Sequence, residues 1–164
     1  MSYTVVDAIA AGLKRHGVTE IFGQSLPSAF FIAAEKAGIR QVMYRTENAG
    51  GAMADGYARA SNRIGIVGAQ NGPAASLLVP PMTEAMLCAV PMLAVVQDVP
   101  TPTRDRNAFQ ELDHIALFQG VTKWLRRVND VSRIDDYIDM AFTAAATGRP
   151  FIPLEHKTHK TLLT

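Results

Sequence analysis

The fold of this chain is decided by the stretch Tyr44-Arg45-Thr46-Glu47-Asn48-Ala49-Gly50-Gly51-Ala52-Met53-Ala54-Asp55-Gly56-Tyr57-Ala58-Arg59. The apolar run that leads into it predicts a buried strand over residues 39–45, and the small residues that follow predict a helix over 48–60. Glu47 stands at the junction, next to Thr46 as a candidate N-cap. The pattern leaves two interpretations open: Glu47 either favours the helix dipole or is the acid of an active site.

Helical and strand patterns alternate along the rest of the chain. Further strands are predicted at 20–23, 64–69, 92–97 and 122–128, and further helices at 4–16, 27–36, 73–89, 112–118 and 130–147, with a kink or break at Pro80-Pro81. This order predicts a three-layer α/β fold, in which helices cover both faces of a parallel sheet of about six strands. Ligands bind beyond the carboxyl ends of the strands in such sheets.

Length and composition narrow the classes of protein. The 164 residues suffice for one domain, and a hydrophobic fraction of 48% argues against disorder. We expect a domain over residues 1–155 and a polar tail over 156–164. Sixteen basic and fifteen acidic residues give no electrostatic footprint for nucleic acid or an anionic membrane.

The apolar run over 85–96 is too short to cross a bilayer and contains Pro91. We therefore expect no membrane partner and, because residues 1–4 lack the features of a signal peptide, a cytoplasmic location. The single cysteine, Cys88, excludes an intrachain disulfide, and its place in the apolar run predicts a buried thiol.

Two more segments fall where a parallel sheet binds ligands. The turn Gln70-Asn71-Gly72-Pro73 follows a predicted strand and opens a helix, so its backbone N–H groups either face a polar ligand or simply form the turn. Gln110 lies just after a proline-bearing loop and offers an amide to a site, although its neighbourhood also fits a helix entry. Glu155, His156 and His159 are metal-ligand types, but their weak spacing in a terminal tail favours a solvated tail, and we expect no metal site on this chain.

Taken together, the motifs resemble the N-terminal pyrimidine-binding domain of thiamine diphosphate enzymes, in the acetolactate synthase, benzoylformate decarboxylase and pyruvate oxidase group. The resemblance covers about residues 3–150 and rests on the order and spacing of several short segments. These are Ile21-Phe22-Gly23, Glu47 with Gly50, Ala54-Asp55-Gly56-Tyr57-Ala58-Arg59, Gly72-Pro73, Ala108-Phe109-Gln110-Glu111 with Asp113, Val121-Thr122-Lys123-Trp124 and Thr147-Gly148-Arg149-Pro150.

The resemblance implies roles for residues of the site. The family's glutamate that matches Glu47 hydrogen-bonds N1′ of the cofactor's aminopyrimidine and assists the proton transfers that activate C2 of the thiazolium. Gln24 and Ser25 in the first turn, and Asn71, Gly72 and Pro73 in the third, are implied to bind the cofactor or lie near the substrate. Gln110 is implied to point into the reaction pocket. The implied activity is decarboxylation or carboligation of a 2-keto acid, in the lyase or transferase class.

The chain departs from the family at several positions of this site. Thr46 stands where the family often has histidine, Ser25-Leu26-Pro27 replaces a Pro-Gly pair, Gln70-Asn71 replaces Thr-Ser, and Leu77 takes the place of an asparagine. These changes leave cofactor activation intact as an expectation and leave the substrate open.

The family's second cofactor domain binds the diphosphate through Mg²⁺ with a Gly-Asp-Gly motif, which this chain lacks. The resemblance therefore implies half an active site, inactive by itself, completed by a diphosphate-binding domain in the same longer chain or in a separate subunit, and a homodimer. The helices near 50–60 and 73–89 are candidates for the dimer contact, unless their small residues serve core packing. Two alternatives remain: a small subunit of a split decarboxylase, and a non-catalytic dimerising domain.

Overall fold

The computed structural model describes residues 4–147 and, for the backbone alone, residues 152–157. Its six strands are β1 (Glu20–Gly23), β2 (Arg40–Met43), β3 (Gly65–Ala69), β4 (Met92–Asp98), β5 (Arg126–Arg127) and β6 (Ile152–Lys157). They form one parallel sheet in the order β2-β1-β3-β4-β6-β5. The predicted three-layer α/β architecture is therefore confirmed.

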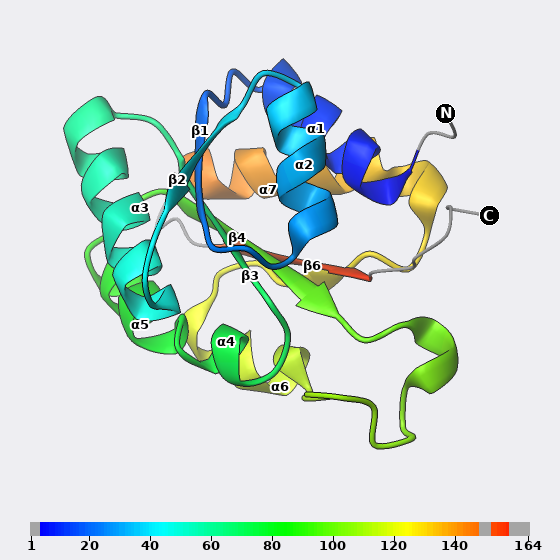
Figure 1. The fold of residues 1–164 in the computed structure, drawn as a ribbon. Helices are drawn as coiled ribbons and strands as arrows, with labels where there is room; N and C mark the ends of the chain where they lie inside the picture. The colour runs from blue at the N-terminus through cyan, green and yellow to red at the C-terminus, as the bar shows by residue number, and fades with distance from the viewer. Residues whose placement is uncertain (1–3, 148–151, 158–164) are drawn as a thin grey trace.

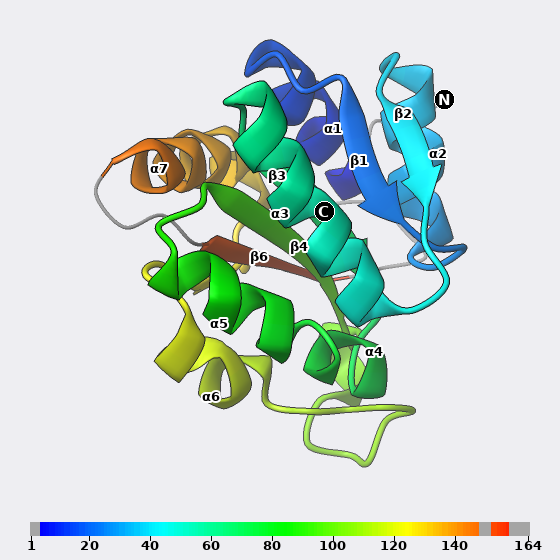
Figure 2. The same ribbon diagram turned by 90° about the vertical axis from the view of Figure 1, so that its left-hand side faces the viewer.

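Helices cover both faces of this sheet (Figures 1 and 2). One face carries α1 (Val5–Arg15), α2 (Ser28–Lys36) and α7 (Ile134–Ala146), and the other carries α3 (Glu47–Ser61), α4 (Pro73–Ser76), α5 (Val79–Leu87) and α6 (His114–Phe118). Three short 3₁₀ turns complete the described elements: η1 (Thr101–Thr103), η2 (Gln119–Val121) and η3 (Val131–Arg133).

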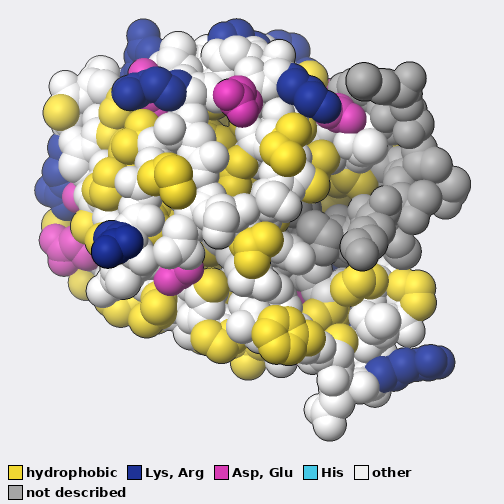
Figure 3. Space-filling view, in the orientation of Figure 1, with side chains coloured by type: hydrophobic (Ala, Val, Ile, Leu, Met, Phe, Trp, Pro, Cys, Tyr) yellow, Lys and Arg dark blue, Asp and Glu magenta, His cyan; other side chains and the backbone are white. Residues whose placement is uncertain are grey.

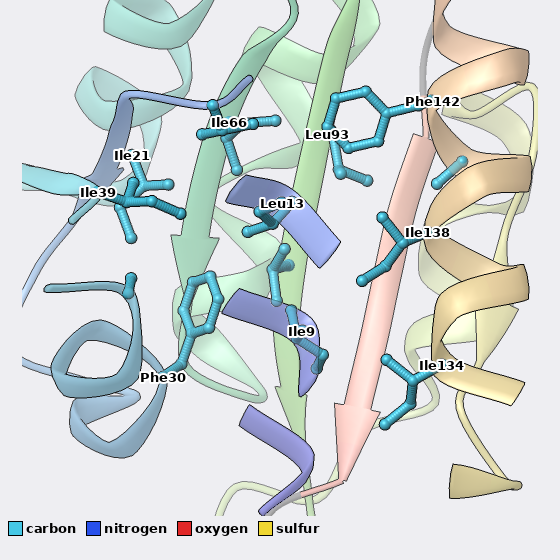
Figure 4. Packing of buried hydrophobic residues seen from close by; sticks show 14 of the residues in the cluster. Ile9, Leu13, Ile21, Phe30, Ile39, Ile66, Leu93, Ile134, Ile138 and Phe142 are labelled. Atoms are coloured by element: carbon cyan, nitrogen blue, oxygen red, sulfur yellow. The ribbon is translucent and has the colours of Figure 1, made fainter. Parts of the chain in front are cut away.

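The central strands β3 and β4 divide their side chains between two cores because successive residues point to opposite faces. On β3, Ile66 packs under α1 and α2, while its neighbour Val67 packs under α3 and α5. Figure 4 shows the first core, in which Ile9 and Leu13 of α1 meet Ile138 of α7 over the strands. Both cores lie against buried strands, so the sheet is a rigid base for its loops.

Local sequence explains where the first helices begin and end. Thr4 and Asp7 form the predicted capping box: the Thr4 hydroxyl accepts from the Asp7 N–H at 3.3 Å, and the Asp7 carboxylate accepts from the Thr4 N–H at 2.9 Å. The Thr4 hydroxyl also donates to the Asp7 carboxylate at 2.5 Å. This hydrogen bond, more than the one from the Thr4 N–H, lowers the pKa of Asp7. Gly17 and Gly38, both with positive φ, follow α1 and α2.

Three predicted elements differ from the structure. The helix expected over 73–89 is two helices, α4 and α5, which separate at Leu77-Leu78 and not at Pro80-Pro81. A proline fits the first turn of a helix and not its interior, so the prolines lie in the first turn of a new helix. The strand expected over 122–128 shrinks to β5, and the helix expected from 130 begins with η3.

Cys88 corrects another prediction, because its side chain is exposed and not buried. It is the C-cap of α5, and the chain then turns through Ala89, at φ 55°, into β4. The apolar run is thus divided between a helix end, a turn and a strand.

The structure describes only part of the C-terminal segment for which predictions were made. β6 runs two residues past the expected domain boundary at 155, and Gly148, Arg149, Pro150 and His159 lie outside the described residues. Within the described part of the chain, none of the helices has the length and apolar character needed to cross a membrane.

Candidate functional site

The sheet has one point where successive connections leave in opposite directions. The chain passes from β1 outward to β2, whereas β3 lies on the other side of β1 and leads to β4. In α/β sheets, ligands bind beyond the carboxyl ends of the strands at such a point. Gln24 and Ser25 follow β1, and Asn71 and Gly72 follow β3, so the predicted cofactor-binding turns lie on either side of it.

Glu47 is the first residue of α3, just beyond the carboxyl end of β2. Its side chain is half-buried and, among the described residues, receives no hydrogen bond. Thr46 occupies the N-cap position, as predicted, but its hydroxyl donates to Asn48 Oδ1 at 2.6 Å and does not cap the helix. The geometry therefore fits a helix-dipole acid and leaves both carboxylate oxygens of Glu47 available to a ligand.

Tyr44 is a buried neighbour of Glu47. Its ring is buried beneath the start of α3, and its hydroxyl donates to the carbonyl oxygen of Gly68 on β3 at 2.7 Å. Burial raises the pKa of Tyr44, and the nearby Glu47 carboxylate raises it further. The phenol stays protonated and directed at the sheet.

Small residues allow α3 to lie close to the sheet. A Cβ at Gly50 would lie 2.1 Å from the Tyr44 ring, and a Cβ at Gly65 would lie 2.2 Å from the carbonyl oxygen of Ala54. Gly50, Gly51, Ala54 and Ala58 are all buried in the chain. Core packing thus explains the small-residue face, and a dimer contact on α3 would have to use other residues.

The turn that follows β1 is hydrogen-bonded to the segment that leads into Glu47. The side-chain amide of Gln24 donates to the carbonyl oxygen of Arg45 at 2.8 Å, and Gln41 donates to the Gln24 carbonyl. Ser25 is exposed beside it. The structure therefore places Gln24 and Glu47 in adjoining turns.

A second group forms around the third turn. Asn71 is 4% exposed, and its side-chain amide donates to the carbonyl oxygens of Phe109 and Gln110, both at 3.0 Å. Gly72 adopts φ 64°, and a Cβ there would lie 2.5 Å from the Gln110 carbonyl oxygen. Asn71, Gly72 and Gln110, which the sequence predicts as separate site residues, are thus in direct contact.

Gln110 combines two unusual features. It adopts φ 57°, a left-handed conformation that costs free energy for a side chain of this kind. Its Oε1 atom is buried and has no hydrogen-bond partner within the part of the chain that the structure describes. A strained residue with an unsatisfied buried acceptor is typical of a functional site and fits a ligand N–H or O–H.

His114 belongs to this group, although nothing in the sequence pattern predicts a role for it. It is 1% exposed, and its Nε2 accepts a hydrogen bond from the Gly72 N–H at 3.0 Å. Its only advance signal is its place directly after Asp113, which caps α6 by accepting from the N–H groups of Ile115 and Ala116.

Two hollows lie near these residues. One of about 430 Å³ runs along the third turn and is lined in part by Gln70, Asn71, Gln97 and Phe109. A larger one, of about 730 Å³, is lined by Asp98, Arg104, Arg127 and neighbouring loop residues and contains none of the predicted site residues. The described residues contain no cluster of three or more His, Cys, Asp or Glu side chains able to hold a metal ion.

Comparison with known proteins gives a consistent result. Residues 3–117 match the family model of the thiamine pyrophosphate enzyme N-terminal TPP binding domain. The chain is 35% identical over 149 residues to an acetolactate synthase large subunit of Parasynechococcus marenigrum, covering 87% of this chain and 24% of the relative. It is 34% identical over 148 residues to a sulfoacetaldehyde acetyltransferase of Rhodobacter capsulatus, covering 88% and 25%. For a chloroplastic acetolactate synthase of Arabidopsis thaliana the identity is 35%, covering 88% and 22%. The chain thus spans about a quarter of the length of these relatives.

Proposed function

Because this chain belongs to the family of N-terminal TPP-binding domains of thiamine pyrophosphate enzymes, we propose that it binds the pyrimidine end of thiamine diphosphate and assists its activation through Glu47. The supporting observation is a half-buried carboxylate at the sheet's ligand-binding edge that has no hydrogen bond among the described residues. The second feature that fits the cofactor is the unsatisfied buried acceptor of Gln110.

Each residue of the site has a defined task in this proposal. Glu47 shares a proton with ring nitrogen N1′ of the aminopyrimidine, because a carboxyl group can both accept and donate there. Gln110 Oε1 accepts from an N–H or O–H of the cofactor or substrate. The turns at Gln24-Ser25 and Asn71-Gly72-Pro73 hold the ring edge. When bound, thiamine diphosphate supplies the electron sink for the chemistry of a 2-keto acid.

The activity proposed for the complete protein is that of a 2-keto acid decarboxylase or carboligase of the acetolactate synthase kind. The substrate is bound next to Gln110. The diphosphate-binding domain, with its Mg²⁺, belongs to the same longer chain, because the relatives are about four times as long as this chain. The presence of both Glu47 and Gln110 favours a catalytic domain over a non-catalytic dimerising one.

Exposed apolar side chains support a covering partner. Met43 is 66% exposed and Phe109 is 79% exposed, and both lie at the carboxyl edge of the sheet. Figure 3 shows hydrophobic side chains across the centre and lower part of one face, with most Lys and Arg side chains toward its upper and left margins. We propose that the diphosphate-binding domain, and a second copy in a homodimer, cover such surfaces.

The test is turnover of a 2-keto acid by the complete protein. Glu47→Gln replaces the ionisable carboxyl group by an amide of the same size, so turnover should fall by about 10²–10⁴-fold. Glu35→Gln, an exposed substitution on α2, is the control and should leave turnover unchanged. Near-normal turnover in Glu47→Gln would contradict the proposal.

A further inference from the structure

The buried side chain of His114 is directed at the backbone of the third turn. His114 begins α6, and its ring lies near that of Phe118, with centroids 6.4 Å apart. Its Nε2 receives the Gly72 N–H at 3.0 Å. A backbone N–H can only donate, so Nε2 carries no proton and acts as the acceptor.

The Gly72 N–H has reason to need this acceptor. Gly72 is buried, and a buried N–H without a partner is strongly disfavoured. Gly72 is also the N-cap of α4, with φ 64° and ψ −121°. Its N–H therefore points away from the α4 hydrogen bonds and into the space that the His114 ring occupies.

The bond to His114 closes a small unit. Asn71 holds the carbonyl oxygens of Phe109 and Gln110, Gly72 touches the Gln110 backbone, and His114 holds Gly72. The unit joins the end of β3 to the loop before α6, two segments about forty residues apart. Both contacts to Gln110 are made to its backbone, which adopts φ 57°, so the turn and the Gln110 backbone are joined directly.

We propose that His114 is a positioning residue. It fixes the position of the Asn71-Gly72-Pro73 turn and, through that turn, directs Gln110 toward the cofactor. This inference rests on the proposed function. The acceptor atom Nε2, and not the bulk of the ring, is the active feature. Misplacement of a site by about 1 Å costs about 10²-fold in rate, so a modest shift of the turn has a measurable effect.

The experiment compares three variants of the complete protein. His114→Gln keeps a side-chain acceptor with similar reach, whereas His114→Asn is equally polar but too short, and His114→Leu has no acceptor. Ala116→Gln, an exposed change on α6, is the control. Two quantities are measured: hydrogen exchange of a peptide covering residues 68–78, and kcat and KM with thiamine diphosphate and Mg²⁺ present.

The expected result separates the variants by acceptor. His114→Asn and His114→Leu should speed exchange in the 68–78 peptide and lower kcat by about 10–100-fold, with a smaller change in KM. His114→Gln should retain most of the protection and most of the turnover. If His114→Leu does not fold, the His114→Gln and His114→Asn pair still decides the question.

Two outcomes would overturn the inference. Equal losses in His114→Gln and His114→Asn would mean that the ring's packing matters and not its acceptor. Faster exchange with unchanged kcat, while Glu47→Gln still lowers turnover, would leave the proposed function standing and remove the positioning role. Failure of Glu47→Gln to lower turnover would instead remove the proposed function, whatever the exchange data show.

Discussion

At the scale of single residues, Gly50 allows the Tyr44 ring to pack against the start of α3, near Glu47. The absent Cβ leaves room for the Tyr44 ring, whose hydroxyl is committed to Gly68. Tyr44 therefore supplies no hydrogen bond to Glu47, and the carboxylate stays available. A glycine is required here because of contact with a ring, not because of its backbone freedom.

The substitution Gly50→Ala tests this packing. Its Cβ would overlap the Tyr44 ring, so the ring must move and its bond to Gly68 must weaken. We expect the free energy of unfolding to fall by about 1–3 kcal/mol, measured by urea denaturation of this chain.

Gly56→Ala, on the same helix, is the matched control. Its site is open, with no atom within 4 Å of the added Cβ. Alanine in an exposed helix interior should raise the free energy of unfolding by about 0.5–1 kcal/mol. If both substitutions changed stability alike, contact with Tyr44 would not be the reason for Gly50.

Some residues of the site can be predicted from the sequence, and others cannot. Glu47, Asn71 and Gln110 were all singled out, because they follow strand ends or match the family's motifs. His114 was not, since nothing in its local pattern shows that its ring reaches a turn forty residues away. Cys88 was misplaced because an apolar run does not reveal that a helix ends within it.

At the scale of elements, the loop that carries Gln110 is held by the neighbouring acid. Glu111 accepts from the N–H of Asp105 at 2.6 Å and from the N–H of Ala108 at 3.0 Å. These backbone hydrogen bonds, the one from Asp105 first, lower the pKa of Glu111 below its usual value of 4.5. The charged carboxylate thus holds residues 105–111 in a defined loop.

Glu111→Gln should loosen this loop, because an amide has one acceptor oxygen in place of two. We expect lower protection factors for the Asp105 and Ala108 amides, measured by hydrogen exchange with NMR detection. Glu35→Gln, at an exposed position of α2, should leave them unchanged. Equal protection in Glu111→Gln and the unsubstituted chain would show that the carboxylate does not hold the loop.

The same bonds fix the pH dependence of the loop. A lowered pKa in the folded state means that the carboxylate stabilises the loop above about pH 4.5 and that this contribution is lost as the pH falls through the lower folded value. Protection at Asp105 and Ala108 should therefore fall in acid, and this change should be absent from Glu111→Gln.

Whole elements were predictable where the pattern was strong. β1 begins and ends where expected, and α1 follows from its capping box. The break between α4 and α5 was expected from Pro80-Pro81 but lies before them, because prolines are accommodated in a first turn. The strand predicted around β5 was too long. The apolar residues that flank β5, among them Trp124, pack against the cores and do not pair with a neighbouring strand.

At the scale of the molecule, the two halves of the candidate site come from opposite sides of the sheet's switch point. Gln24 and Glu47 lie on the β1–β2 side, and Asn71, Gly72, Gln110 and His114 lie on the β3–β4 side. The alternation of elements predicted that these turns share one edge of the sheet. The hydrogen bonds within each half, from Gln24 to Arg45 and from Asn71 to Phe109 and Gln110, required the structure, since they connect residues distant in sequence.

Activation of the cofactor by Glu47 is tested most simply by the rate at which the C2 proton of bound thiamine diphosphate exchanges with deuterium in the complete protein. This rate reports activation before any substrate binds, so it does not depend on which 2-keto acid is used. We expect Glu47→Gln to slow the exchange by about 10²–10⁴-fold while the cofactor remains bound. Exchange in Glu47→Gln as fast as in the unsubstituted protein, at the same cofactor occupancy, would contradict it.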